Sequence, residues 1–198
     1  MKKGKIFKGF LLALLLASTF AVSANAAETR QNVGARWEDE SATVYFYCGF
    51  NSIWKNEISA AMNSWNNVLG LYNEIIVPMA FTSNSNHTNK IYSTSGQTWL
   101  ALAHWDKSNG YFTQMSIAFN SGSYTYTVGA TSGKYDIQSI ALHELGHAIG
   151  IAHCHEMEET SCFSQTCSTN VMQPTISDNC TRRNLSSYDT SSKMAIYW

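Results

Sequence analysis

The chain of 198 residues has little charge, because only 14% of its residues are Asp, Glu, Lys or Arg. Four of its thirteen basic residues are lysines among the first ten positions. After position 26, nine Lys and Arg residues stand against fourteen Asp and Glu residues, a net charge of −5, and the pair Arg182-Arg183 is the only basic cluster. A nucleic-acid-binding surface requires concentrated positive charge, so the composition disfavours nucleic-acid binding.

The sequence also lacks internal repeats, linkers and low-complexity tracts, which indicates a single domain. Its longest apolar run, Phe10 to Val22, is shorter than a membrane helix requires. Lysines precede this run and Ala24-Asn25-Ala26 follows it, an order typical of a secretory signal peptide. No cysteine follows closely, which disfavours a lipid anchor. We therefore predict a signal peptide over residues 1–26 and a secreted, monomeric domain over 27–198 with no membrane anchor.

Cysteine is scarce, and none of the five cysteines forms the CxxC pair of a structural zinc site. Four of them, Cys154, Cys162, Cys167 and Cys180, lie close together near the end of the chain. In an exported protein such cysteines form disulfides by default, so we expect two bridges, with three pairings open. Cys48 would be left over, unless it pairs into the cluster and frees another thiol. A structural Cys₄ zinc site is the less favoured alternative.

The most informative pattern that is present is HELGHAIGIAH over residues 143–153. On a helix, residues four apart lie on one face about one turn apart, so His143 and His147 can bind the same metal ion. Gly150 permits a left-handed turn that would return His153 to that ion. Three protein ligands leave a fourth position open, which is the arrangement of a catalytic zinc site.

Glu144 follows the first of these ligands and is placed to act as a general base on a water at the metal. Asp136 is a suitable N-cap, and the apolar residues after it recur at helical spacing, which predicts that the motif lies on a helix. Gly146, inside that helix, costs about 1 kcal/mol relative to alanine. No pattern in the sequence explains its presence.

Other potential ligands fit less well. His155 lies two residues beyond His153, but the glycine offset favours His153. His104 and Asp106 resemble half of a second metal site; because His87 is the only other nearby histidine, a surface or packing role is favoured. No acidic loop has a calcium-binding spacing.

The motif HExxHxxGxxH resembles that of the metzincin zinc endopeptidases, which also have a methionine turn beneath the metal. Met172, nineteen residues beyond His153, corresponds to that methionine. Position 174 is proline, so the tyrosine ligand of astacins and serralysins is missing, and Met-x-Pro is similar to matrixins. The stretch Asn184–Asp189, which predicts a capping box at the start of a final helix, is also similar.

This resemblance implies an α+β fold of the α/β/α-like metzincin type. In it, a twisted mixed sheet lies over an active-site helix and a backing helix, with a small irregular C-terminal subdomain below a cleft. The residue patterns agree in their order. They predict strands over 41–48, 75–82, 91–93 and 115–120, a helix over 53–69 that Gly70 ends, and the motif helix.

The resemblance further implies a secreted zinc metalloendopeptidase that cleaves proteins or peptides with one catalytic zinc. Its substrate would lie extended along an edge strand near Met115–Asn120. Pro174 and Ile176 would form the wall of the pocket for the residue after the scissile bond. Calcium is compatible with the resemblance but has no motif here. Residues 27–40 are too short for a folded prodomain and contain no cysteine switch, which departs from vertebrate matrixins.

The alternative from another class is a secreted binding or adhesion module in which zinc only braces the fold. Glu144 argues against this alternative, because a purely structural site has no use for that carboxylate.

Overall fold

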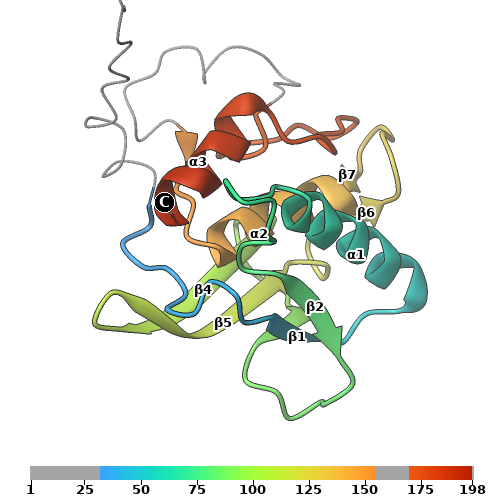
Figure 1. Cartoon of the computed structure of the whole chain (residues 1–198). Coiled ribbons are helices and arrows are strands. Elements are labelled where there is room, and N and C mark those ends of the chain that lie inside the picture. Colours follow the sequence, from blue (N-terminus) through green and yellow to red (C-terminus); the bar gives the residue numbers. More distant parts are fainter. Residues whose placement is uncertain (1–31, 155–169, 198) are drawn as a thin grey trace, which may run out of the picture.

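The computed structural model describes residues 32–154 and 170–197. The predicted signal peptide, His155, Cys162 and Cys167 lie outside these ranges. Within them, no helix has the length and apolar character to cross a membrane. The elements (Figure 1) are β1 (Val44–Cys48), α1 (Ser52–Asn66), β2 (Met79–Thr82), β3 (Lys90–Ser93), β4 (Ala101–Ser108), β5 (Tyr111–Phe119), β6 (Tyr126–Thr127), β7 (Tyr135–Asp136), α2 (Ile137–Ala148) and α3 (Ser187–Tyr197).

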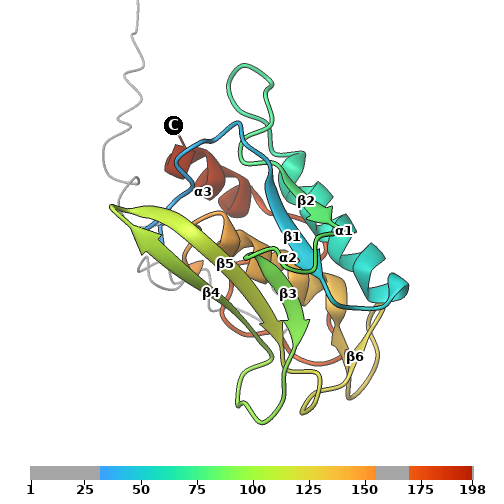
Figure 2. The same cartoon turned by 90° about the horizontal axis from the view of Figure 1, so that it is seen from below.

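Five strands form one mixed sheet in the order β2-β1-β3-β5-β4. The first four of these run parallel, whereas β4 pairs antiparallel with β5. In Figure 2 the twisted sheet lies in front, and α1 and α2 cover its rear face. The short strands β6 and β7 form a separate two-stranded ladder ahead of α2. The predicted α+β architecture of a mixed sheet over two helices is confirmed.

The predicted helix over 53–69 is present as α1, but it ends at Asn66, short of Gly70. Its N-cap is Asn51, whose side chain accepts a hydrogen bond from the Trp54 N–H. Residues at helical spacing turn one face of α1 into the core, with Ile58 and Trp65 fully buried. The indole N–H of Trp65 donates to the carbonyl of Leu142 in α2 at 2.8 Å, so α1 holds α2 from behind.

The strand predicted over 75–82 is shorter in the structure, because β2 begins only at Met79. Val77 has a left-handed backbone with φ +48°, which takes residue 77 out of the extended conformation. Pro78 follows and has no N–H to donate to a neighbouring strand. The predicted strands over 41–48 and 91–93 are present as β1 and β3.

The strand β4 has no counterpart among the predicted elements, and its presence overturns one prediction. Met115–Asn120 falls almost entirely within β5, but β5 lies between β3 and β4. The prediction that it is the edge strand for substrate is therefore wrong, and β4 is the edge strand on this side of the sheet. The sequence did contain a local signal for β4, because the pair Asn109-Gly110 is typical of a two-residue hairpin turn. In the structure both residues have positive φ and join β4 to β5.

The final helix, α3, packs against the end of α1 through a buried lysine. Lys193 has no exposed surface, and its Nζ donates to the carbonyl oxygens of Trp65 at 2.7 Å and Val68 at 3.3 Å. Trp65 lies in the last turn of α1, where a cation is favourable, and Val68 follows shortly after the helix ends. Burial nevertheless lowers the pKa of Lys193 to about 8.

Replacing Lys193 with methionine tests this buried charge. An unfolded lysine titrates near pH 10.4, so between about pH 8 and that value the unfolded chain holds a proton that the folded chain has released. The stability of the wild type therefore rises with pH in this window. We expect the free energy of unfolding of the wild type to rise relative to that of Lys193→Met by about 3 kcal/mol across this window, with no such rise below about pH 8. Urea unfolding at a series of pH values measures this; a difference independent of pH would contradict it.

Candidate metal centre

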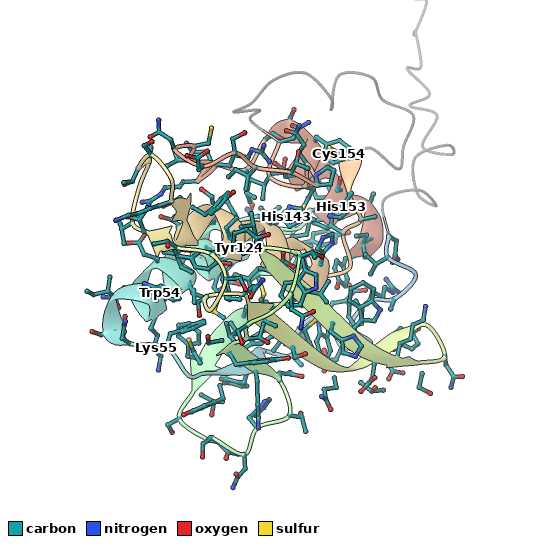
Figure 3. All side chains as sticks on the ribbon, turned by 180° about the vertical axis from the view of Figure 1, so that it is seen from behind. Trp54, Lys55, Tyr124, His143, His153 and Cys154 are labelled. Atoms are coloured by element: carbon teal, nitrogen blue, oxygen red, sulfur yellow. The ribbon has the colours of Figure 1, made fainter. Side chains whose placement is uncertain are left out.

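Three histidine side chains converge at the C-terminal end of α2. His143 and His147 come from consecutive turns of the helix, and His153 comes from the chain that follows it. The Nε2 atom of His153 lies 3.1 Å from that of His143 and 3.0 Å from that of His147. Figure 3 shows His143 and His153 close together, with Cys154 next to them. Among the described residues, these three form the only group of three or more side chains that could hold a metal ion.

The chain returns to the helix through a left-handed turn at Gly150. Its φ is +93°, and its N–H donates to the His147 carbonyl at 2.9 Å. A Cβ added to Gly150 would lie 2.8 Å from the carbonyl oxygen of Ala35, because the N-terminal segment crosses this turn. The predicted role of Gly150 is therefore met, and neighbouring backbone adds a second reason for glycine.

Hydrogen bonds of the histidines indicate which ring nitrogens face one another. The Nδ1 atom of His143 lies 2.8 Å from the Val171 carbonyl, and that of His147 lies 2.7 Å from the Ile151 carbonyl. A carbonyl only accepts hydrogen bonds, so each Nδ1 carries the proton and each Nε2 presents a lone pair. A proton on His153 Nε2 could serve only one of them.

A metal cation fits this arrangement, since it would satisfy all three converging lone pairs at once. Nitrogen ligands bound tetrahedrally to one zinc ion are about 3.3 Å apart, close to the two separations from the His153 Nε2 atom. Burial lowers the pKa of His147 to about 4. Burial, with the neighbouring imidazoles, also lowers the pKa of His143 well below its usual range. Both rings are therefore neutral at pH 7, which is the form that binds metals.

Glu144 lies beside these rings, and the edge strand holds its carboxyl group. The residue is only 6% exposed, and its Oε2 accepts the Ala103 N–H of β4 at 2.7 Å. Burial raises the pKa of Glu144 to about 8, although that hydrogen bond opposes the shift. A buried carboxyl group whose pKa lies near neutrality is suited to accepting and returning a proton.

Met172 is fully buried directly against α2, and its position explains Gly146. A Cβ at Gly146 would overlap the Met172 sulfur and would lie 3.1 Å from Cζ2 of Trp65. Glycine inside the helix thus makes room for a close contact between α2 and the segment around residue 172. This contact joins residues distant in sequence, which is why the local pattern did not predict it.

Asp189 holds the same segment from the other side. Its carboxylate accepts the backbone N–H groups of Val171 at 3.0 Å and Met172 at 3.2 Å. It also accepts the Ser186 N–H, and its own N–H donates to the Ser186 hydroxyl, so the predicted capping box is present. The capping pattern identified Asp189 as a helix-start residue but not as the residue that fixes the methionine turn.

A cavity of about 380 Å³ adjoins the three histidines and Glu144. One side is formed by residues 99–102 at the start of β4, and the other by residues 173–176, which include Pro174 and Ile176. Ser139 and Arg182 also line it, and no sequence pattern had indicated either residue as part of a site.

The weaker candidate ligands do not join this centre. His104 and Asp106 are exposed on β4 and belong to no group of metal-binding side chains within 32–154 and 170–197. Of the described cysteines, Cys48 is buried and carries a free thiol.

The matrixin family model, of peptidase family M10, matches residues 50–197, which include α1, all three histidines and α3. No curated protein matches the chain.

Gly146→Ala tests the close contact with Met172. Alanine favours a helix by about 1 kcal/mol over glycine, so the local effect alone would stabilise α2. We expect instead a loss of about 1–3 kcal/mol in the free energy of unfolding, because the added methyl group overpacks the core at Met172 and Trp65.

Gly49→Ala is the matched control for urea unfolding, because its added Cβ would approach only the Ile91 carbonyl, at an ordinary 3.8 Å. Its effect should stay within about 0.5 kcal/mol. A stabilised Gly146→Ala variant would show that the Met172 contact does not govern this position.

Proposed function

The chain belongs to the matrixin family of zinc metallopeptidases, and we propose that it is a secreted endopeptidase with Glu144 as its general base. The observation that carries this proposal is the convergence of three imidazole Nε2 atoms beside a buried carboxyl group in one cavity. His143, His147 and His153 would hold the zinc ion. When bound in such a site, zinc lowers the pKa of water to about 7 and polarises the scissile carbonyl.

The residues around the site would transfer the protons of the reaction and fix the protons of the histidine rings. Glu144 would take the proton of the attacking water and then give it to the leaving amine. Its hydrogen bond from the Ala103 N–H would hold the carboxyl group in place during both transfers. The carbonyls of Val171 and Ile151 keep the protons of His143 and His147 on Nδ1, which leaves Nε2 available to the metal.

The substrate would pair with β4, the edge strand beside the cavity. An edge strand has unpaired backbone N–H and C=O groups, to which an extended peptide can bind as a further strand. Pro174 and Ile176 would form the wall of the pocket for the residue that follows the scissile bond.

We propose that this domain is exported and that two disulfides stabilise the region after the metal ligands. The lysine-rich and then apolar start of the sequence supports export. The free thiol of Cys48, together with the disulfide-bonded state of Cys154 and Cys180, supports bridges within the C-terminal cluster. Their pairing stays a prediction.

Glu144→Ala tests the proposed base. We expect the variant to bind one zinc ion per chain, as the wild type does, because no histidine is altered. Its kcat should fall by about 10²–10⁴-fold with any peptide that the wild type cleaves. Glu74→Ala is the control, because it removes an exposed carboxylate that is distant from Glu144 in the sequence. Undiminished hydrolysis by Glu144→Ala would exclude this mechanism.

Removing zinc separates the peptidase from a module that zinc merely braces. A chelator should abolish hydrolysis, and added zinc should restore it. The far-ultraviolet circular dichroism should stay close to that of the zinc-loaded protein, because Trp65 and Trp37 hold α2 through backbone carbonyls that do not involve the metal. Unfolding on chelation, without turnover of any peptide beforehand, would support the bracing role instead.

A further inference from the structure

The cavity has a polar floor beyond the metal centre, toward the N-terminus of α2. Ser139 and His143 both line the cavity and are four residues apart, which is about one helical turn or 5.4 Å. The Ser139 hydroxyl accepts the backbone N–H of Arg182 at 2.7 Å and so fixes that residue against the helix. A side chain that entered between the walls of the cavity would therefore reach Arg182 after passing the metal ligands.

Arg182 is a buried cation without a direct counterion. It is 5% exposed, and its guanidinium donates to two backbone carbonyls, those of Gln173 at 3.5 Å and Thr175 at 2.6 Å. Its Nε is buried and has no hydrogen-bond partner among the described residues. Within the same part of the chain, no carboxylate lies within 4.0 Å of it.

The neighbouring arginine, unlike Arg182, has carboxylate partners. Arg183 forms ion pairs with both Asp136 and Glu57. Asp189 is the carboxylate whose charge acts on Arg182, but it already accepts hydrogen bonds from Val171, Met172 and Ser186. A buried charge that lacks a partner destabilises a fold by several kcal/mol, so a ligand that neutralises Arg182 would gain binding free energy.

A second buried group in the wall also lacks a partner. Gln173 is 9% exposed, and its Oε1 finds no donor among the described residues. Rotation about its last side-chain bond would present the amide nitrogen as a donor in the same place. The cavity also has apolar lining residues, Ile140, Pro174 and Ile176, which form a passage to this polar floor.

We propose that this pocket selects glutamate as the residue that follows the scissile bond. The methylene groups of glutamate would lie against the apolar passage, and its carboxylate would accept hydrogen bonds from Arg182 and Gln173. Glutamate suits the depth of about one helical turn better than the shorter aspartate does. The inference rests on the proposed peptidase function and specifies its substrate class.

Three peptides that differ only after the scissile bond, with Glu, Gln or Leu there, test the proposal on the zinc-loaded wild type. Gln has the shape of Glu without its charge. We expect kcat/KM for the Glu peptide to exceed that for each of the others by about tenfold or more, as for a charge-assisted hydrogen bond. Equal or faster cleavage of the Gln or Leu peptide would overturn the proposal.

Arg182→Met should lower the Glu-to-Leu ratio of kcat/KM by about tenfold or more. Arg36→Met is the matched control, because Arg36 is a guanidinium outside the cavity, and it should leave the ratio unchanged. An equal loss with all three peptides in Arg182→Met would assign Arg182 a purely structural role and overturn the proposal.

If Arg182→Met does not fold, Arg182→Lys replaces it in the test, because lysine keeps the positive charge. This variant should still cleave the Glu peptide faster than the Gln peptide. Loss of that preference, with the Leu peptide still cleaved, would contradict the role of charge. Failure of the proposed function has a different result. The wild type would then hydrolyse none of the three peptides, and the inference would fail with it.

Discussion

The close approach of the methionine turn to α2 is the contact on which the rest of the site depends. Met172 occupies the space that a side chain at Gly146 would take, with Trp65 of α1 next to it. Because the turn lies so near, the Val171 carbonyl reaches His143. The residues that continue the turn then form one wall of the cavity. Glycine at position 146 weakens the helix, but its lack of a side chain allows the close packing beneath the three histidines.

Buried ionisable groups in this protein differ in how they are compensated. Asp136 is neutralised by Arg183 and caps α2, and Asp189 is surrounded by backbone donors. Lys193 and Arg182 instead rest on backbone carbonyls, which accept hydrogen bonds but carry no full charge. Lys193 lies in the core, whereas Arg182 lines the cavity, so a ligand can reach only the second of these cations.

Predictions from the sequence succeeded where the pattern was local. The Asp136 N-cap was predicted from its side chain, and the apolar stripe of α1 and the two histidines on α2 follow from helical periodicity. The prediction of the edge strand failed because β5 reads as a strand by its own alternation, while its place in the sheet depends on pairing with β3 and β4. The Asn109-Gly110 turn was the local signal for β4, and it indicates a hairpin but not which strand is outermost.

The sequence by itself determined which three histidines come together and the family. The spacing of His143 and His147 follows from the helical repeat, and Gly150 provides the left-handed turn before His153. Only the tertiary structure decided why Gly146 is glycine, which strand borders the cleft, and that Arg182 lines the cavity. Each of these depends on contacts between segments that are far apart in the chain, and such contacts leave no periodic trace in the residues on either side.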